Sequence, residues 1–131
     1  MRLRKSSVVV PLLCLVLAAC GSDRPAPSEW RATWEAVTAG IPELSMVNAE
    51  GPDTAACETT LAYLRSNRAE LLPSPDLAID DAVNSWFEIA EDAFFECPPE
   101  SAQMGSFSDA YTELGVLEAE IEVVLQLRAN S

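Results

Sequence analysis

Apolar residues recur at helical spacing in four segments of this chain, and Pro- or Gly-containing stretches separate these segments. Side chains three or four positions apart share one face of an α-helix, whereas strict alternation indicates a strand. The predicted helices are Glu29–Ala39, Asp53 or Thr54 to Leu71, Ile79 or Asp80 to Cys97, and Ser106 or Ser108 to Arg128. We therefore expect an all-α fold, a small bundle of three to four helices.

Side-chain caps and helix lengths set the predicted helix starts. Ser28 is the expected N-cap of the first helix, and Ser106 with Asp109 forms a weak capping box before the last one. The second and third helices should form an antiparallel hairpin of matched length, which favours a third helix that starts at Ile79 or Asp80. Residues 73–78 then form a structured connection between the two helices.

The third predicted helix has the clearest division between an apolar and an acidic face. Its apolar face consists of Ile79, Val83, Trp86, Ala90, Phe94 and Cys97. Phe95 is the exception, because it falls in the middle of the acidic face. This ring is therefore either covered by another segment or exposed at a partner surface.

The last predicted helix is apolar on two sides, so it requires neighbours on both. The first face contains Phe107, Tyr111, Leu114, Leu117, Ile121, Val124 and Leu125, and the second contains Val116, Val123 and Leu127. Either this helix is central in the bundle, or its second face meets another chain. Glu118 falls within the first face, so it should reach the rim or pair with an arginine.

Two pairs of residues allow both a structural and a functional interpretation. Trp30 and Trp34 share one face of the first helix, which favours core positions. An exposed pair would instead insert at a membrane interface or stack on a sugar ring. Arg65 and Arg68 lie near the end of the second helix, where cations complement the helix dipole and pair with carboxylates. Their alternative role is to clamp an anionic ligand.

The first twenty residues have the layout of a cleaved export signal. A basic start and an apolar run that ends at Leu17 lead to two alanines and Cys20. The sequence Leu-Ala-Ala-Cys at 17–20 resembles the lipobox of bacterial lipoproteins at all four positions. The resemblance implies that Cys20 receives a diacylglycerol thioether and becomes the new N-terminus. A retained transmembrane anchor is the alternative, but Pro11 interrupts the apolar run, which is short and weakly apolar at its end.

The lipoprotein resemblance divides the chain into a signal peptide at 1–19, a flexible tether at 20–28 and a helical domain at 29–131. It also implies a location at the extracytoplasmic face of the cell membrane. The stretch from Cys57 to Pro99 also resembles uncharacterised small lipoproteins of actinobacteria. The residues that carry this second resemblance are Leu61, Leu64, Arg65, Pro73, Ser74, Pro75, Asp76, Trp86, Cys97 and Pro98. It implies no activity.

Two cysteines remain in the predicted domain, Cys57 and Cys97. In an exported protein an even pair favours a disulfide, and both residues are expected on apolar stripes at the same end of the hairpin. The bond would staple the second helix to the third. A free redox pair or a metal pair is the alternative, but no third ligand of a suitable type accompanies them.

Removal of the signal changes the formal net charge from -13 to -16, because its three cations leave with it. The remaining cations are Arg24, Arg31, Arg65, Arg68 and Arg128, against 21 carboxylates. Such a surface repels phosphate backbones and anionic headgroups, which argues against nucleic-acid binding and against electrostatic docking on a membrane. Membrane attachment must therefore come from the lipid.

The composition also excludes several kinds of catalysis. Without His or Lys after the signal, the domain lacks Ser-His, Cys-His and Ser-Lys nucleophile pairs and His-ligated metals within one subunit. Pairs of carboxylates can catalyse glycoside hydrolysis, but they do not indicate an enzyme here. Any fold of so acidic a chain brings some carboxylates close together. We expect a non-enzymatic protein with no catalytic residue, no dedicated metal site and no cofactor.

The expected function is that of a lipid-anchored, extracytoplasmic module that binds an envelope or secreted protein. Its candidate contacts are Phe95, Val116, Val123 and Leu127, and a second copy of the chain is one candidate partner for the last helix. The alternative is a small-ligand binder with an enclosed cavity of roughly 300 Å³ or more between the helices. That cavity would be lined by Trp30, Trp34, Trp86 and Tyr111, and Arg65 or Arg68 would orient the ligand.

Replacing Cys57 or Cys97 by Ser should lower the free energy of unfolding by about 2–4 kcal/mol, because the disulfide would close a loop of about 40 residues. Thermal unfolding followed by circular dichroism under oxidising conditions measures this loss. The double variant is the control, and it should be about as stable as either single variant. Unchanged melting temperatures in the single variants would contradict the bond.

Overall fold

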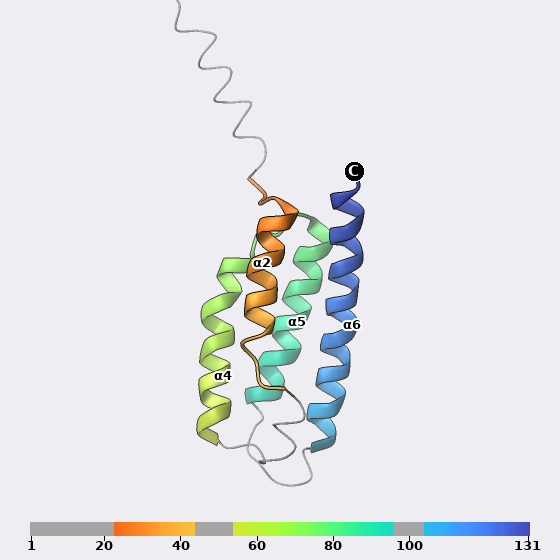
Figure 1. Ribbon diagram of the computed structural model, residues 1–131. Coiled ribbons are helices and arrows are strands. Elements are labelled where there is room, and N and C mark those ends of the chain that lie inside the picture. The colour runs from red at the N-terminus through yellow and green to blue at the C-terminus, as the bar shows by residue number, and fades with distance from the viewer. Residues whose placement is uncertain (1–22, 44–53, 96–103) are drawn as a thin grey trace, which may run out of the picture.

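The computed structural model describes residues 23–43, 54–95 and 104–131. Its helices are α2 (Pro27–Thr38), α4 (Thr54–Asn67), the 3-10 turn η1 (Arg68–Leu71), α5 (Leu77–Phe95) and α6 (Met104–Ala129). These described ranges contain four α-helices and no strand, which confirms the prediction of an all-α bundle (Figure 1).

The four α-helices lie side by side with α5 between α4 and α6 (Figure 1). Successive helices α4, α5 and α6 alternate in direction, and α2 packs against both α6 and η1. The start of α2, the connection between α4 and α5, and the C-terminus therefore meet at the same end of the bundle.

Aromatic side chains from α2 and α5 form the centre of the core. Trp30 and Trp34 stack with ring centroids 5.6 Å apart, and Trp34 meets Trp86 edge-on at 5.2 Å. Phe87 packs edge-on against Trp86 at 5.1 Å. Trp30 and Trp34 are only 2% and 6% exposed, so the core interpretation of this pair is confirmed.

The predicted apolar faces are the buried ones. The buried apolar residues are Trp30, Trp34, Val37, Cys57, Leu64, Leu71, Ile79, Val83, Trp86, Phe87, Ala90, Phe94, Phe107, Leu114, Ile121 and Leu125. Phe87 is the member that the predicted stripe of the third helix did not include. It is fully buried because η1 covers this side of α5, where the Arg68 guanidinium lies 5.8 Å from the ring centroid.

The serine caps predicted for two helices are wrong. Ala26 precedes α2 without a side-chain cap, and Pro27 occupies the first turn. Proline suits this place because the first helical N–H groups have no intrahelical partner. Since α6 begins at Met104, both Ser106 and Ser108 lie inside the helix rather than before it.

The predicted start of α5 at Ile79 or Asp80 is also wrong, because the helix begins at Leu77. Asp76 acts as its cap, with the Ala78 N–H donating to the Asp76 carboxylate at 2.8 Å. The length comparison with α4 assumed α-helical geometry throughout. The last four residues of the predicted second helix form the 3-10 turn η1, which rises about 2.0 Å per residue instead of about 1.5 Å. This segment is therefore longer than a continuous α-helix, and a matching α5 can start earlier.

Cys57 lies on the buried side of α4 with 4% exposure, as the apolar stripe predicted. Cys97 lies outside the described residues, so the Cys57–Cys97 pairing stays a prediction. The predicted stop at Pro98 and Pro99, and the cap at Asp53, lie outside them as well.

Two glycines offer a matched test of the packing. The Tyr63 hydroxyl donates to the Val37 carbonyl at 3.0 Å, and a Cβ at Gly40 would overlap this hydroxyl, whereas a Cβ at Gly115 would meet nothing. Gly40→Ala should therefore lower stability by about 1 kcal/mol through loss of that hydrogen bond. Gly115→Ala should raise it by about 0.5–1 kcal/mol, because Ala is the better helix former in α6. Melting temperatures measure both, and a Gly40→Ala variant that is as stable as the original chain would contradict the Tyr63 contact.

Candidate interaction surface

Three large apolar side chains of α6 face solvent in a line. Val116, Val123 and Leu127 are 56%, 56% and 66% exposed, and their spacing places them opposite the buried face of the same helix. We call these three residues the α6 strip. The second apolar face predicted for the last helix therefore exists, and α2 does not cover it.

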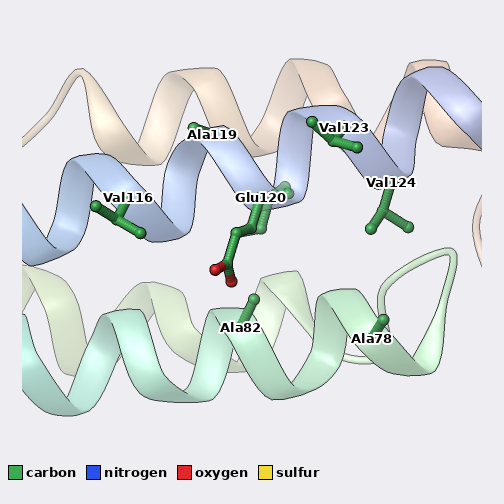
Figure 2. Close-up of a pocket in the computed structure, with 8 residues that line it drawn as sticks. Ala78, Ala82, Val116, Ala119, Glu120, Val123 and Val124 are labelled. Carbon is green, nitrogen blue, oxygen red and sulfur yellow. The ribbon is translucent and has the colours of Figure 1, made fainter.

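An open cavity of about 570 Å³ lies beside the α6 strip, between α5 and α6 (Figure 2). Its lining residues are Ala78, Ala82, Val116, Ala119, Glu120, Ile121, Val123 and Val124. We call it the α5–α6 groove. It exists because alanines on both helices leave a space that larger side chains would fill. Glu120 is the one charged lining residue, and Figure 2 shows its carboxylate over Ala82.

Four of the five arginines in the described residues form ion pairs that hold parts of the bundle together. Arg31 of α2 pairs with Glu122 of α6 at 2.9 Å. Arg68 of η1 donates to the Asn84 side chain of α5 at 2.9 Å and has Glu91 within 3.8 Å. Each of these contacts joins two different elements. Arg68 therefore has the ion-pairing role predicted for it.

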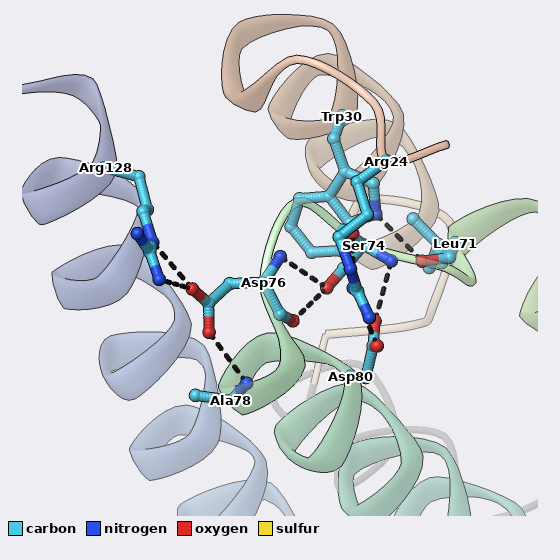
Figure 3. A network of polar contacts seen from close by, with 8 residues as sticks. All are labelled: Arg24, Trp30, Leu71, Ser74, Asp76, Ala78, Asp80 and Arg128. Carbon is cyan, nitrogen blue, oxygen red and sulfur yellow. Dashed lines mark hydrogen bonds and ion pairs between the residues drawn. The ribbon is translucent and has the colours of Figure 1, made fainter. Parts of the chain in front are cut away.

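Arg24 ties the segment before α2 to the start of α5 (Figure 3). Its guanidinium donates to the Ser74 carbonyl at 2.8 Å and to the Asp80 carboxylate at 2.9 Å. Ser74 is fully buried, and its N–H donates to Asp80 at 2.7 Å. The predicted tether at 20–28 is therefore shorter than expected, since the chain is held to the bundle from Arg24 onward.

The C-terminus of α6 is held at the same end. Arg128 donates through Nε to Asp76 at 2.6 Å, and this carboxylate also caps α5. The Trp30 indole N–H donates to the Leu71 carbonyl at 2.9 Å, which joins α2 to η1 (Figure 3). One polar network thus connects three helices at this end.

Three exposed carboxylates on or beside the groove have no such partners. Within the part of the chain that the structure describes, Asp81, Glu113 and Glu120 form no side-chain hydrogen bond or ion pair. Asp76 and Glu122, also close to the groove, are paired with Arg128 and Arg31. Arg65, the remaining cation, is exposed on α4, which α5 separates from α6. The α5–α6 groove is therefore apolar inside and anionic around its edge.

The residues predicted to line a ligand cavity do not converge on one. Trp86 is fully buried, and its indole N–H donates to Glu118 at 3.0 Å. Glu118 was predicted to reach the rim or to pair with an arginine. It is half-buried at the edge of an open pocket and accepts this hydrogen bond, and it has no arginine partner in the described residues. Tyr111 donates to the Pro42 carbonyl, and burial raises the pKa of its hydroxyl to about 12. Tyr111 and Glu118 border a shallow, open pocket of about 300 Å³ that contains none of the tryptophans.

Phe95 is 70% exposed, so of its two predicted environments the exposed one is found, and no other segment of the described residues covers the ring. It lies 13 residues after Ala82 on α5, about 20 Å along the helix, so it does not belong to the α5–α6 groove. Leu77, also 70% exposed, lies at the groove end of α5. Leu77, the three groove alanines and Glu120 were not predicted from the sequence. Only the pairing of α5 with α6 brings these residues together, and no periodicity within one helix reveals it.

Comparison with known proteins finds no family model that matches this chain, and no significant match among curated proteins or solved structures. None of the helices in residues 23–43, 54–95 and 104–131 is both long and apolar enough to span a membrane. The same residues contain no group of three or more acidic or Cys side chains arranged to hold a metal ion.

Asp80 should make the stability of the bundle depend on pH. Burial raises the pKa of its carboxyl, but the hydrogen bonds from Ser74 and Arg24 outweigh burial and lower it below the ordinary value of 3.8. A lowered pKa in the folded state adds stability above pH 4, and this stability is lost as pH falls through the folded pKa. Asp80→Asn should therefore be less stable at pH 7 and lose less stability on acidification.

Chemical denaturation between pH 7 and pH 2 measures this difference. Asp81→Asn is the matched control, because Asp81 is adjacent and has no ion pair in the described residues. Its pH profile should follow that of the original chain. Parallel profiles for Asp80→Asn and the original chain would contradict the role of the Arg24–Asp80 contact.

Proposed function

We propose that this protein is a non-enzymatic interaction module, attached by a lipid on Cys20 to the extracytoplasmic face of the cell membrane. It binds another protein of the cell envelope, or a secreted one, through the α6 strip and the α5–α6 groove. The Cys57–Cys97 disulfide staples the second helix of the domain to the third.

One observation carries the proposal: a solvent-exposed apolar strip adjoins an apolar groove on a bundle whose core is already closed. The core residues are 0–6% exposed, whereas the three strip residues are 56–66% exposed. Contiguous apolar surface on a small soluble domain is typical of an interaction site. Its extension over two helices distinguishes it from a single exposed side chain.

The burial of the tryptophans favours this function over small-molecule binding. A ligand pocket needs concave space next to aromatic and polar groups. Trp30, Trp34 and Trp86 are packed against one another and leave no such space between them. The open space lies instead at the surface between α5 and α6, where a helix or loop of another protein can reach it.

The lipid anchor is supported by the lipobox at 17–20, where a cysteine follows two small residues at the end of an apolar run. Cleavage before Cys20 would keep all the described core residues, from Trp30 to Leu125, on the mature chain together with Arg24.

Photocrosslinking in the producing cells tests both parts of this function. A p-benzoylphenylalanine residue in place of Val123 should give a crosslinked protein, whereas the same residue in place of Ala62, exposed on α4, should not. Cys20→Ala should move the protein out of the membrane fraction and remove the crosslink. Unchanged membrane retention of Cys20→Ala would contradict the lipid anchor, and equal crosslinking from both positions would contradict the surface.

A further inference from the structure

We infer that the α5–α6 groove binds one amphipathic helix of the partner protein, and that the polar face of this helix carries Lys or Arg residues. This inference rests on the proposed function, because it names the chemistry of the partner that the surface accepts. Its two supports are the shape of the groove and the unpaired carboxylates around it.

The shape of the surface matches a helix. Val116 and Leu127 are 11 residues apart, about 17 Å along α6, which corresponds to about three turns of a partner helix. The groove is lined by small side chains, Ala78 and Ala82 on α5 and Ala119 on α6. They let the partner helix approach both helices closely. Side chains at positions i, i+3, i+4 and i+7 of that helix would fill the space between α5 and α6.

The charges around the groove require a cation from the partner. Glu120 lines the groove, and no ion pair within the described residues neutralises it. An apolar partner would remove this carboxylate from water without compensation, which is costly. A Lys or Arg on the partner would instead pair with Glu120 and with the exposed Glu113 or Asp81 nearby.

The same charges argue against two other occupants. A second copy of this chain would bring the unpaired carboxylates of two α6 helices close together. Four of its five arginines after the signal are bound within its own bundle, and Arg65 lies on α4, away from α6. An anionic membrane surface would be repelled in the same way. A cationic protein helix satisfies both the apolar strip and its acidic edge.

Defined peptides test this inference on the full chain reconstituted in phosphatidylcholine nanodiscs. The probe is a fluorescent 15-residue helix of Leu and Lys, with Leu at i, i+3, i+4 and i+7. A Leu and Glu peptide of the same pattern and a scrambled Leu and Lys peptide are the controls. Fluorescence anisotropy measures binding, and the signal from empty nanodiscs is subtracted. We expect the patterned Leu and Lys peptide to bind at least about tenfold more tightly than either control.

Variants of the chain then locate the bound peptide. Val123→Asp and Glu120→Lys should each weaken binding about tenfold, because one removes apolar contact and the other reverses the charge. Glu58→Lys, exposed on α4, makes the same change in net charge and should alter binding less than about twofold. Melting temperatures close to that of the original chain show that the variants remain folded.

Several results would overturn the inference. They are equal binding of the Leu and Glu peptide, equal weakening by Glu58→Lys and Glu120→Lys, or binding no greater than that of empty nanodiscs. Energy transfer between labelled copies in one nanodisc that Val123→Asp abolishes would identify a second copy as the occupant, which also overturns it. If p-benzoylphenylalanine in place of Val123 still crosslinks a protein in cells, the proposed function stands and only the inferred partner chemistry is wrong.

Discussion

The packing of three indole rings between α2 and α5 is the interaction on which the rest of this small domain depends. Trp30, Trp34 and Trp86 fill the centre of the bundle, and two of their N–H groups are satisfied by Leu71 and Glu118. Rings of this size supply a large apolar area from few residues, which a short chain needs. Because α2 is held here, it covers one side of α6 and leaves the opposite side open.

The small number of arginines determines the charge of the surface. Arg24, Arg31 and Arg128 each connect segments that are distant in the sequence, and Arg68 connects η1 to the helix that follows it. Surface ion pairs stabilise a protein only slightly on their own, but these fix the positions of the N-terminal segment, η1 and the last turn of α6. Within the described residues, the outer side of α5 and α6 has no unpaired cation, because Arg128 is already bound to Asp76. Its acidity therefore follows from where the few arginines are bound.

Much of this fold was predictable from periodicity, because a buried helix face repeats every three to four residues. The stripes of α5 and α6 were identified in this way, and so was the exposed α6 strip. The helix starts were less predictable, since Asp76 and Pro27 compete with serines as signals and η1 departs from α-helical geometry. The α5–α6 groove was not predictable, because it depends on the register of Ala82 against Glu120 on two different helices.

The Arg24 contact also decides how a lipid on Cys20 would orient the domain. Arg24 is four positions after Cys20, and an extended chain spans at most about 3.6 Å per residue, so the anchor would lie within about 14 Å of that end of the bundle. The C-terminal end of α6 lies at the same end (Figure 1), where Arg128 pairs with Asp76. That end of the bundle would then lie nearest the bilayer, so a partner attached to the same membrane would reach the Leu127 end of the α6 strip first.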